Sequence, residues 1–209
     1  MTKVDLKGKL IVFEGLDFTG KSTQVKLLAD WLGEKDVTVT ATREPGGTRM
    51  GERLRDLVLS RKNTEIVPLS ELLLIVACRA QLYREVIKPS LDRGDTVLSS
   101  RYRLSSLAYQ GYGRGIDLDL IRRLNDAATK GQRADITLLI DLPEDVALAR
   151  KRGHGDRIEG EDLAFYRRVR RGYIELARGD ESIHTIEGTG SITQIAESVR
   201  DYLDTHVLS

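Results

Sequence analysis

The chain has 209 residues, of which 40% are hydrophobic and 31% are charged, and its formal net charge is +1. This length suits one compact domain with a buried core, and the composition is typical of a globular protein rather than a disordered one. The near-zero charge argues against a protein that coats DNA, so we expect no nucleic acid polymer as a partner. We predict a single domain over residues 1–209.

The sequence also bears on compartment and membrane. No apolar stretch reaches the about 18 residues that a membrane span needs, and residues 1–9 lack the apolar core of a signal peptide. Cys78 is the only cysteine, so no internal disulfide can form, and its apolar neighbours place it in the core. We therefore expect a cytoplasmic protein that does not bind a membrane.

Strands and helices are predicted to alternate along the chain. Continuous apolar or β-branched runs predict five strands, at residues 10–13, 37–42, 96–98, 136–140 and 183–186. Helical periodicity predicts helices at residues 21–31, around 50–58, and at 70–93, 118–130, 162–178 and 192–203. This order predicts an α/β fold of three layers, in which helices cover both faces of a five-stranded parallel sheet. Residues 101–115 are rich in Tyr, Ser and Gly, and we expect them to be functional rather than core.

A phosphate-binding loop follows the first strand. Residues 15–22 match G-x-x-x-x-G-K-[ST] without a mismatch, between a strand and a helix. In this motif backbone N–H groups surround phosphate oxygens, the lysine reaches the β- and γ-phosphates, and the hydroxyl ligates Mg²⁺. We therefore predict a P-loop NTPase fold with Lys21 as a catalytic residue and Ser22 as a metal ligand. The predicted ATP-binding residues are Gly15, Leu16, Asp17, Phe18, Thr19, Gly20, Lys21, Ser22 and Thr23. The motif alone does not choose among kinases, GTPases and ATPases. The sequence lacks the Asn-Lys-x-Asp stretch that reads guanine in GTPases, which makes a GTPase less favoured.

Further segments point to a particular family. Residues 43–48 read Arg-Glu-Pro-Gly-Gly-Thr, and residues 105–111 read Ser-Ser-Leu-Ala-Tyr-Gln-Gly; Arg101-Tyr102 precedes the second, and Asp-Arg-Ile-Glu stands at residues 156–159. In this order and spacing the chain resembles thymidylate kinases from about Leu10 to Leu203. The resemblance implies an enzyme that uses ATP and Mg²⁺ to phosphorylate dTMP to dTDP in dTTP biosynthesis, and that is usually a homodimer.

The resemblance also implies roles for single residues. Asp17 would meet the deoxyribose 3′-hydroxyl, Arg55 and Arg101 would hold the acceptor phosphate, and Arg79 would lie beside the thymine ring. Arginine suits a phosphate dianion because its planar fork donates two parallel hydrogen bonds. Arg101 is also expected to be catalytic. Without the family pattern, Arg55 and Arg79 would be interpreted as solvated helix residues. The other predicted substrate residues are Glu44, Pro45, Ser106, Tyr109 and Gln110.

Residues 150–161 resemble the lid that closes over ATP in this family. Some members carry a catalytic arginine inside the phosphate-binding loop, but this chain has Phe18 and Thr19 there. The arginine that neutralises the transferred phosphate should therefore come from the lid, and we predict Arg152 and Arg157.

The chain departs from the family at position 100, where Ser100 replaces the usual Asp before Arg101. An acid after a buried strand usually helps to organise Mg²⁺, so we expect Asp17 and Glu159 to supply negative charge, with Glu159 as a metal ligand. Phe18 is a second unusual residue, and its ring is expected beside the acceptor site. Three interpretations stay open: a dTMP kinase, a nucleotide-binding protein with weak or lost kinase activity, and a kinase for dUMP or another nucleotide.

Overall fold

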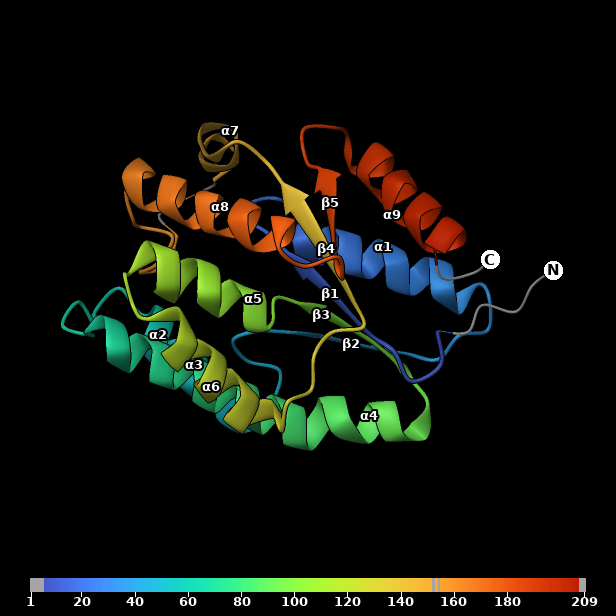
Figure 1. Ribbon diagram of the computed structural model, residues 1–209, viewed down its shortest axis with the longest axis horizontal. Helices are drawn as coiled ribbons and strands as arrows, with labels where there is room; N and C mark the ends of the chain where they lie inside the picture. The colour runs from blue at the N-terminus through green and yellow to red at the C-terminus, as the bar shows by residue number, and fades with distance from the viewer. Residues whose placement is uncertain (1–5, 152, 154, 207–209) are drawn as a thin grey trace.

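The computed structural model describes residues 6–151, 153 and 155–206, and it contains a five-stranded parallel sheet (Figure 1). The order of the strands in the sheet is β2-β3-β1-β4-β5, and every neighbouring pair is parallel. Their bounds are β1 (Leu10–Glu14), β2 (Val39–Arg43), β3 (Thr96–Ser100), β4 (Ile136–Asp141) and β5 (Ile183–Glu187). All five predicted strands, and the predicted parallel sheet, are confirmed.

Helices cover both faces of this sheet. On one face α1 (Lys21–Gly33) packs beside α9 (Ile192–His206). The other helices are α2 (Arg49–Leu59), α3 (Pro68–Leu82), α4 (Lys88–Arg93), α5 (Arg103–Ser106), α6 (Leu118–Thr129), α7 (Glu144–Ala149) and α8 (Leu163–Arg178), with π-helical turns η1 (Tyr83–Ile87) and η2 (Leu107–Gly113). No helix in the described part of the chain is long and apolar enough to span a membrane.

Strand β1 explains why the central strands are apolar throughout. Alternate residues of a strand point to opposite faces of the sheet. Ile11 and Phe13 pack with the side chains of α1 and α9, whereas Leu10 and Val12 pack with η1 and the residues around Tyr102. Both faces are covered, so all five positions of β1 are buried.

The predicted long helix at residues 70–93 is helical throughout but is divided into three parts. It begins at Pro68, widens into the π-helical turn η1, and continues as α4. Pro89 accounts for the widening, because proline has no N–H and its ring collides with the carbonyl four residues earlier in a regular α-helix. The N–H of Lys88 accordingly bonds to the carbonyl of Tyr83, five residues back.

Residues 101–115 were predicted to be functional and not part of the core. The exclusion from the core is wrong, because several of these residues are buried in it. Ala108 and Tyr109 belong to a buried cluster with aromatic residues of α8, such as Phe165. Close packing explains the glycines here, because a Cβ on Gly113 would lie 2.7 Å from the Phe165 ring. Cys78 is buried, as predicted.

Candidate active site

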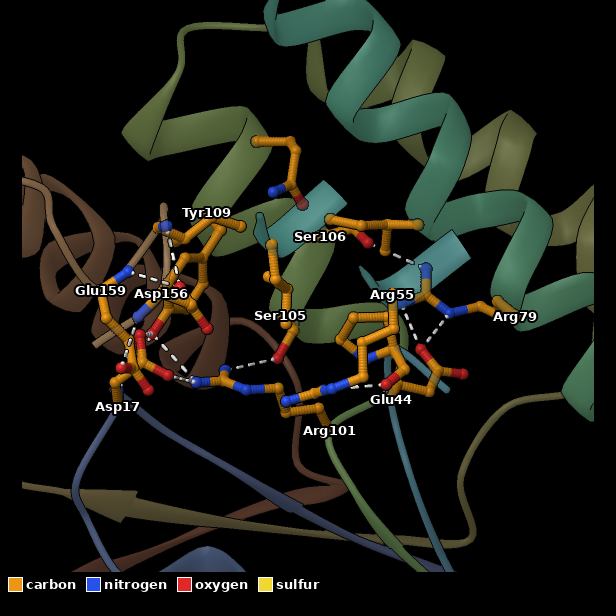
Figure 2. A pocket seen from close by; sticks show the side chains of 15 residues that line it. Asp17, Glu44, Arg55, Arg79, Arg101, Ser105, Ser106, Tyr109, Asp156 and Glu159 are labelled. Carbon is orange, nitrogen blue, oxygen red and sulfur yellow. Dashed lines mark hydrogen bonds and ion pairs between the residues drawn. The ribbon is translucent and has the colours of Figure 1, made fainter. Parts of the chain in front are cut away.

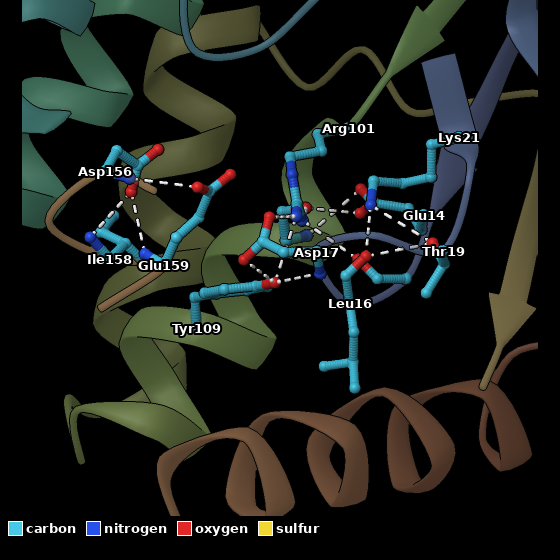
Figure 3. Close-up of polar contacts among 12 residues, drawn as sticks. Glu14, Leu16, Asp17, Thr19, Lys21, Arg101, Tyr109, Asp156, Ile158 and Glu159 are labelled. Carbon is cyan, nitrogen blue, oxygen red and sulfur yellow. Dashed lines mark hydrogen bonds and ion pairs between the residues drawn. The ribbon is translucent and has the colours of Figure 1, made fainter. Parts of the chain in front are cut away.

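The phosphate-binding loop joins β1 to α1, and its shape requires glycine. Gly15 has a φ of +136°, and a Cβ there would lie 2.4 Å from the carbonyl oxygen of Ile140. Lys21 turns back over the loop, where its Nζ donates to the carbonyl oxygen of Leu16 and to Thr19 Oγ1 (Figure 3). Burial, together with the positive charge of Arg101, lowers the pKa of Lys21 to about 7. Its ammonium form would therefore be stabilised when the side chain leaves the loop and pairs with a phosphate anion.

A cavity opens beside this loop, and we call it the phosphate-loop cavity. Its lining includes Asp17, Phe18, Gly20, Lys21, Ser22 and Thr23 from the predicted ATP site, and Arg43, Glu44, Arg55, Ser100, Arg101 and Glu159 from elsewhere. Gly15, Leu16 and Thr19 do not line it and instead shape the loop. Phe18 lines this cavity and is not among the residues of the acceptor pocket, so the expectation that its ring lies beside the acceptor site stays a prediction. Its backbone has a φ of 65°.

A second cavity, the acceptor pocket, brings together all nine predicted substrate residues (Figure 2). These are Asp17, Glu44, Pro45, Arg55, Arg79, Arg101, Ser106, Tyr109 and Gln110. They come from the phosphate-binding loop, the residues after β2, α2, α3, the residue after β3, α5 and η2. The two cavities share Asp17, Glu44, Arg55, Arg101 and Glu159, so they meet at one edge.

Arg101 stands at this shared edge. It pairs with Asp17 at 2.5 Å and donates to Tyr109 Oη at 3.1 Å (Figure 3). It also donates to Ser105 Oγ at 3.0 Å (Figure 2). Burial opposes its charge, but Tyr109 and Asp17 raise the pKa of Arg101 well above its ordinary value. Although burial would raise it, the pKa of Asp17 is lowered, because Arg101 and Lys21 stabilise the carboxylate. A bound phosphate must compete with Asp17 for this guanidinium.

Sequence reasoning missed the residues that support Arg101. Tyr166 donates to Asp17 Oδ2 at 3.2 Å, and Tyr173 accepts from Arg101 and donates to Glu14 Oε2 at 3.0 Å. Tyr166 and Tyr173 are seven residues apart on α8, a spacing that puts them on one helix face and could have signalled a shared role. Glu14 lies in the run Phe13-Glu14-Gly15-Leu16-Asp17, which also resembles the family where it enters the phosphate-binding loop, but no role was predicted for it.

Arg79 is fully buried, so its interpretation as a solvated residue is wrong. Its five N–H groups are all used within the protein: two on Glu44 Oε2 and one each on Ser106 Oγ, Asn125 Oδ1 and the carbonyl oxygen of Tyr102. Burial raises the pKa of Glu44 against the opposing charge of Arg79, and Glu44 Oε1 is buried without a partner among the described residues. Asn125 on α6 was missed by the sequence analysis.

Arg55, on α2, lines both cavities and donates to the carbonyl oxygen of Pro45 at 2.9 Å. Burial and the positive charge of Arg43 lower its pKa, and Arg101 acts in the same direction. Arg55 and Arg101 thus place two positive charges at the shared edge, which favours the binding of an anion there.

The base of the predicted lid is docked beside the acceptor pocket. Arg152 lies outside the described residues. Arg157 lines neither cavity and donates to Glu71 Oε2 at 2.8 Å and to the carbonyl oxygen of Val58 at 2.9 Å. Its catalytic role stays a prediction, which requires these contacts to break.

The oxygen donors at the shared edge fit a cation that brings phosphate ligands with it. Burial, with Asp156 and Asp17 adding negative charge, raises the pKa of Glu159, while Ser22 lines the same cavity. In the described residues, no cluster of three or more His, Cys, Asp or Glu side chains could hold a metal alone. Mg²⁺ commonly binds one or two carboxylates together with substrate phosphates and water, and Glu159 and Ser22 offer oxygen donors of this kind. Ser100 lines this cavity without charge.

A phosphate-binding loop that opens onto a second pocket with arginines at the shared edge defines the class: the chain is a P-loop nucleoside monophosphate kinase, a phosphotransferase. The sequence model described as thymidylate kinase matches residues 13–199. The chain therefore belongs to the thymidylate kinase family.

Individual relatives agree with this assignment. The thymidylate kinase of Carboxydothermus hydrogenoformans is 44% identical over 201 residues, which cover 95% of this chain and 98% of that protein. The thymidylate kinase of Trichormus variabilis is 44% identical over 205 residues, 96% of this chain and 97% of the relative. Among solved structures, the thymidylate kinase of Ehrlichia chaffeensis superposes with a TM-score of 0.80 at 36% identity, over 95% of this chain and 99% of that one.

Proposed function

We propose that the protein transfers the γ-phosphoryl group of ATP to dTMP, giving dTDP and ADP, as a cytoplasmic step of dTTP biosynthesis. The observation that carries the proposal is the edge shared by the phosphate-loop cavity and the acceptor pocket, where Arg55 and Arg101 meet Asp17 and Glu159. The thymidylate kinase family, to which the chain belongs, supports the same reaction and does not favour a binding protein without transfer chemistry.

The phosphate-binding loop is proposed to hold the donor. Its backbone N–H groups and the positive end of α1 would surround the β- and γ-phosphates. Lys21 would leave the carbonyl oxygen of Leu16 for the phosphates, and its pKa would rise again beside them.

The acceptor pocket is proposed to hold dTMP with its phosphate toward the shared edge. Arg101 and Arg55 would bind that phosphate, and Arg101 would exchange its contact with Asp17 for it. Asp17 is then free to accept from the 3′-hydroxyl of the sugar. Tyr109 would pack against the sugar, Ser106 and Gln110 would bind the base, and Glu44 Oε1 would accept a hydrogen bond from the ligand or water.

In the transfer step an oxygen of the dTMP phosphate forms a bond to the γ-phosphorus, and the bond from that phosphorus to the bridging oxygen of ADP breaks. Lys21 and Arg101 neutralise the charge that spreads over the equatorial oxygens, and the lid arginines Arg152 and Arg157 are proposed to add to this. Mg²⁺ would supply further charge neutralisation, and Ser22 and Glu159 are the residues that would hold it.

The test is ADP formation from Mg²⁺ and ATP, with and without dTMP, in the native protein, Ser100→Asp and Lys21→Ala. Turnover that needs dTMP and is lost in Lys21→Ala supports the proposal. Turnover in Ser100→Asp alone would show that the native chain lost its chemistry when serine replaced the acid at this position. If neither the native protein nor Ser100→Asp turns over with dTMP, dTMP is contradicted as the acceptor.

We also propose that the protein is a single-domain homodimer that pairs through α2 and α3. Exposed apolar side chains gather on these helices and just before α3: Met50, Leu57, Val67, Leu69 and Leu73. Large exposed apolar patches mark interaction surfaces on soluble proteins.

A further inference from the structure

Glu71, on α3, is a buried carboxylate that joins three segments around the acceptor pocket. Its Oε1 accepts from Gln110 Nε2 at 2.9 Å and from Arg114 Nε at 3.2 Å. Its Oε2 accepts from Arg114 Nη2 at 3.0 Å and from Arg157 Nη2 at 2.8 Å. The side chain is 1% exposed, and burial acts to raise its pKa. Hydrogen bonds from Arg114 and Gln110 nevertheless hold the pKa below its ordinary value, so Glu71 is ionised.

An ionised carboxylate can only accept hydrogen bonds, and this fixes the orientation of the Gln110 amide. Gln110 must turn its NH₂ group to Glu71, so its carbonyl Oε1 is the group left for other partners. Gln110 lines the acceptor pocket, and its Oε1 has no hydrogen-bond partner in the described part of the chain. The pocket is therefore offered a hydrogen-bond acceptor.

A matching donor comes from Ser106 in the same pocket (Figure 2). Ser106 Oγ accepts from Arg79 Nη1 at 2.9 Å, and a hydroxyl that accepts one hydrogen bond still carries its own proton to donate. An acceptor and a donor in one pocket can complement the N3–H and the C4 carbonyl of thymine or uracil. Cytosine presents the reverse pattern, an acceptor at N3 and an amino donor at C4.

We propose that Glu71 is a positioning residue that sets base specificity: by holding the Gln110 amide in one orientation, it makes the acceptor pocket accept keto pyrimidines and reject cytosine. This inference rests on the proposed function, since it concerns the acceptor nucleotide of the same reaction. Glu71 acts through Gln110 and is not itself placed against the base.

The substitution Glu71→Gln should reverse the pattern. Glutamine offers one oxygen and one NH₂ group. Two arginine N–H groups donate to the Oε2 position, whereas only one, Arg114 Nε at 3.2 Å, donates to the Oε1 position beside the Gln110 amide, so the oxygen belongs at Oε2. The NH₂ group then takes the Oε1 position and donates toward Gln110. Gln110 turns its oxygen to receive it and presents its own NH₂ group to the pocket.

We expect kcat/KM for dTMP to fall about ten- to hundredfold in Glu71→Gln. The hydrogen bond from thymine N3–H to Gln110 Oε1 is lost, and the Gln110 NH₂ group faces N3–H instead, so two donors oppose each other. For dCMP the value should rise, so the ratio of dTMP to dCMP should fall more than the dTMP value alone. The matched control is Glu161→Gln, which removes the other carboxylate on Arg114, at 2.7 Å, without touching Gln110. Its ratio should stay at the native value.

The double variant Glu71→Gln with Gln110→Met tests whether the effect passes through Gln110. Methionine removes both amide groups at similar size, so Glu71→Gln should leave the ratio of the Gln110→Met protein unchanged. Equal losses for dTMP and dCMP in Glu71→Gln, or the same fall in ratio in the control, would overturn the inference. If circular dichroism shows Glu71→Gln unfolded, Glu71→Asp decides. It keeps a negative charge beside both arginines but is one methylene shorter, which weakens the contact that orients Gln110, and an unchanged ratio would overturn the inference.

Calorimetric dissociation constants for dTMP and dCMP accompany the rates. If the native protein binds dTMP over dCMP but transfers no phosphate, the proposed function fails while the binding ratio still tests Glu71. A native preference for dCMP overturns both.

Discussion

Replacing Arg79 by leucine would remove the partner of a buried carboxylate and should be strongly destabilising. In the native protein the guanidinium is fully buried, and Glu44 is 4% exposed. The substitution leaves Glu44 Oε2 without its two hydrogen bonds, while Oε1 already lacks a partner among the described residues. Ser106, Asn125 and the carbonyl of Tyr102 each lose a donor as well. Breaking a buried ion pair on one side costs about 3–5 kcal/mol, and we expect a loss of this size.

The loss should depend on pH in a defined direction. Burial already raises the pKa of Glu44 above its ordinary value of 4.5, and removing Arg79 takes away the charge that opposes this. In the variant, the folded state then binds a proton at Glu44 that the unfolded state has released. Stability falls as pH rises in that range, by about 1.4 kcal/mol for each unit of additional pKa shift. The difference between Arg79→Leu and the native protein should therefore shrink from about pH 8 toward about pH 5.

Urea denaturation of both proteins across this pH range measures the effect. Arg84→Leu is the matched control, because Arg84 is an exposed arginine on the same helical run, and its change should be below about 0.5 kcal/mol. Adding Glu44→Leu to Arg79→Leu should recover part of the loss and remove its pH dependence. A loss below about 1 kcal/mol, or one that is constant with pH, would refute the account of a buried pair.

The phosphate-binding loop and the exposed face of α3 offer three more tests. Without bound nucleotide the pKa of Lys21 is about 7, so MgATP binding at about pH 8 should be accompanied by proton uptake as the lysine becomes charged. Calorimetry in buffers of different ionisation enthalpy measures this uptake, and equal uptake in Lys21→Met would contradict the prediction. Phe18 has a φ of 65°, so Phe18→Gly should raise the free energy of unfolding in urea by about 1 kcal/mol, and a lower stability would show that ring packing outweighs backbone strain. Leu73 is 46% exposed on α3, so Leu73→Glu should convert a dimer into a monomer in light scattering, whereas a native monomer would count against the proposed interface.

Much of the site was predictable because its residues lie in short segments with local signals. The phosphate-binding loop is fixed by its glycines and by the strand and helix around it, and the segments at 43–48 and 105–111 hold several of the substrate residues. In a parallel sheet the carboxyl ends of neighbouring strands meet at one edge, so motifs after β1, β2 and β3 had to converge.

The surroundings of these residues were not predictable, because they depend on contacts between distant elements. Asn125 bonds to Arg79 across 46 positions, and Arg157 bonds to Glu71 across 86. The pattern that marks a helix arginine is the same whether the residue is solvated or buried. Only the packing of α3 against α6 and η2 places Arg79 inside.

The loss of the family's usual acid at position 100 can be judged against the charges that remain. Ser100 is 6% exposed at the end of β3 and lines the phosphate-loop cavity, next in sequence to Arg101. Asp17 already neutralises Arg101 at 2.5 Å, and Glu159 shares the same edge. A further buried carboxylate would raise the repulsion among these acids unless a cation were bound. The cavity therefore keeps negative charge for Mg²⁺ even with serine in place of the acid. We predict that serine at this position permits transfer and that its effect falls on metal affinity more than on the binding of dTMP.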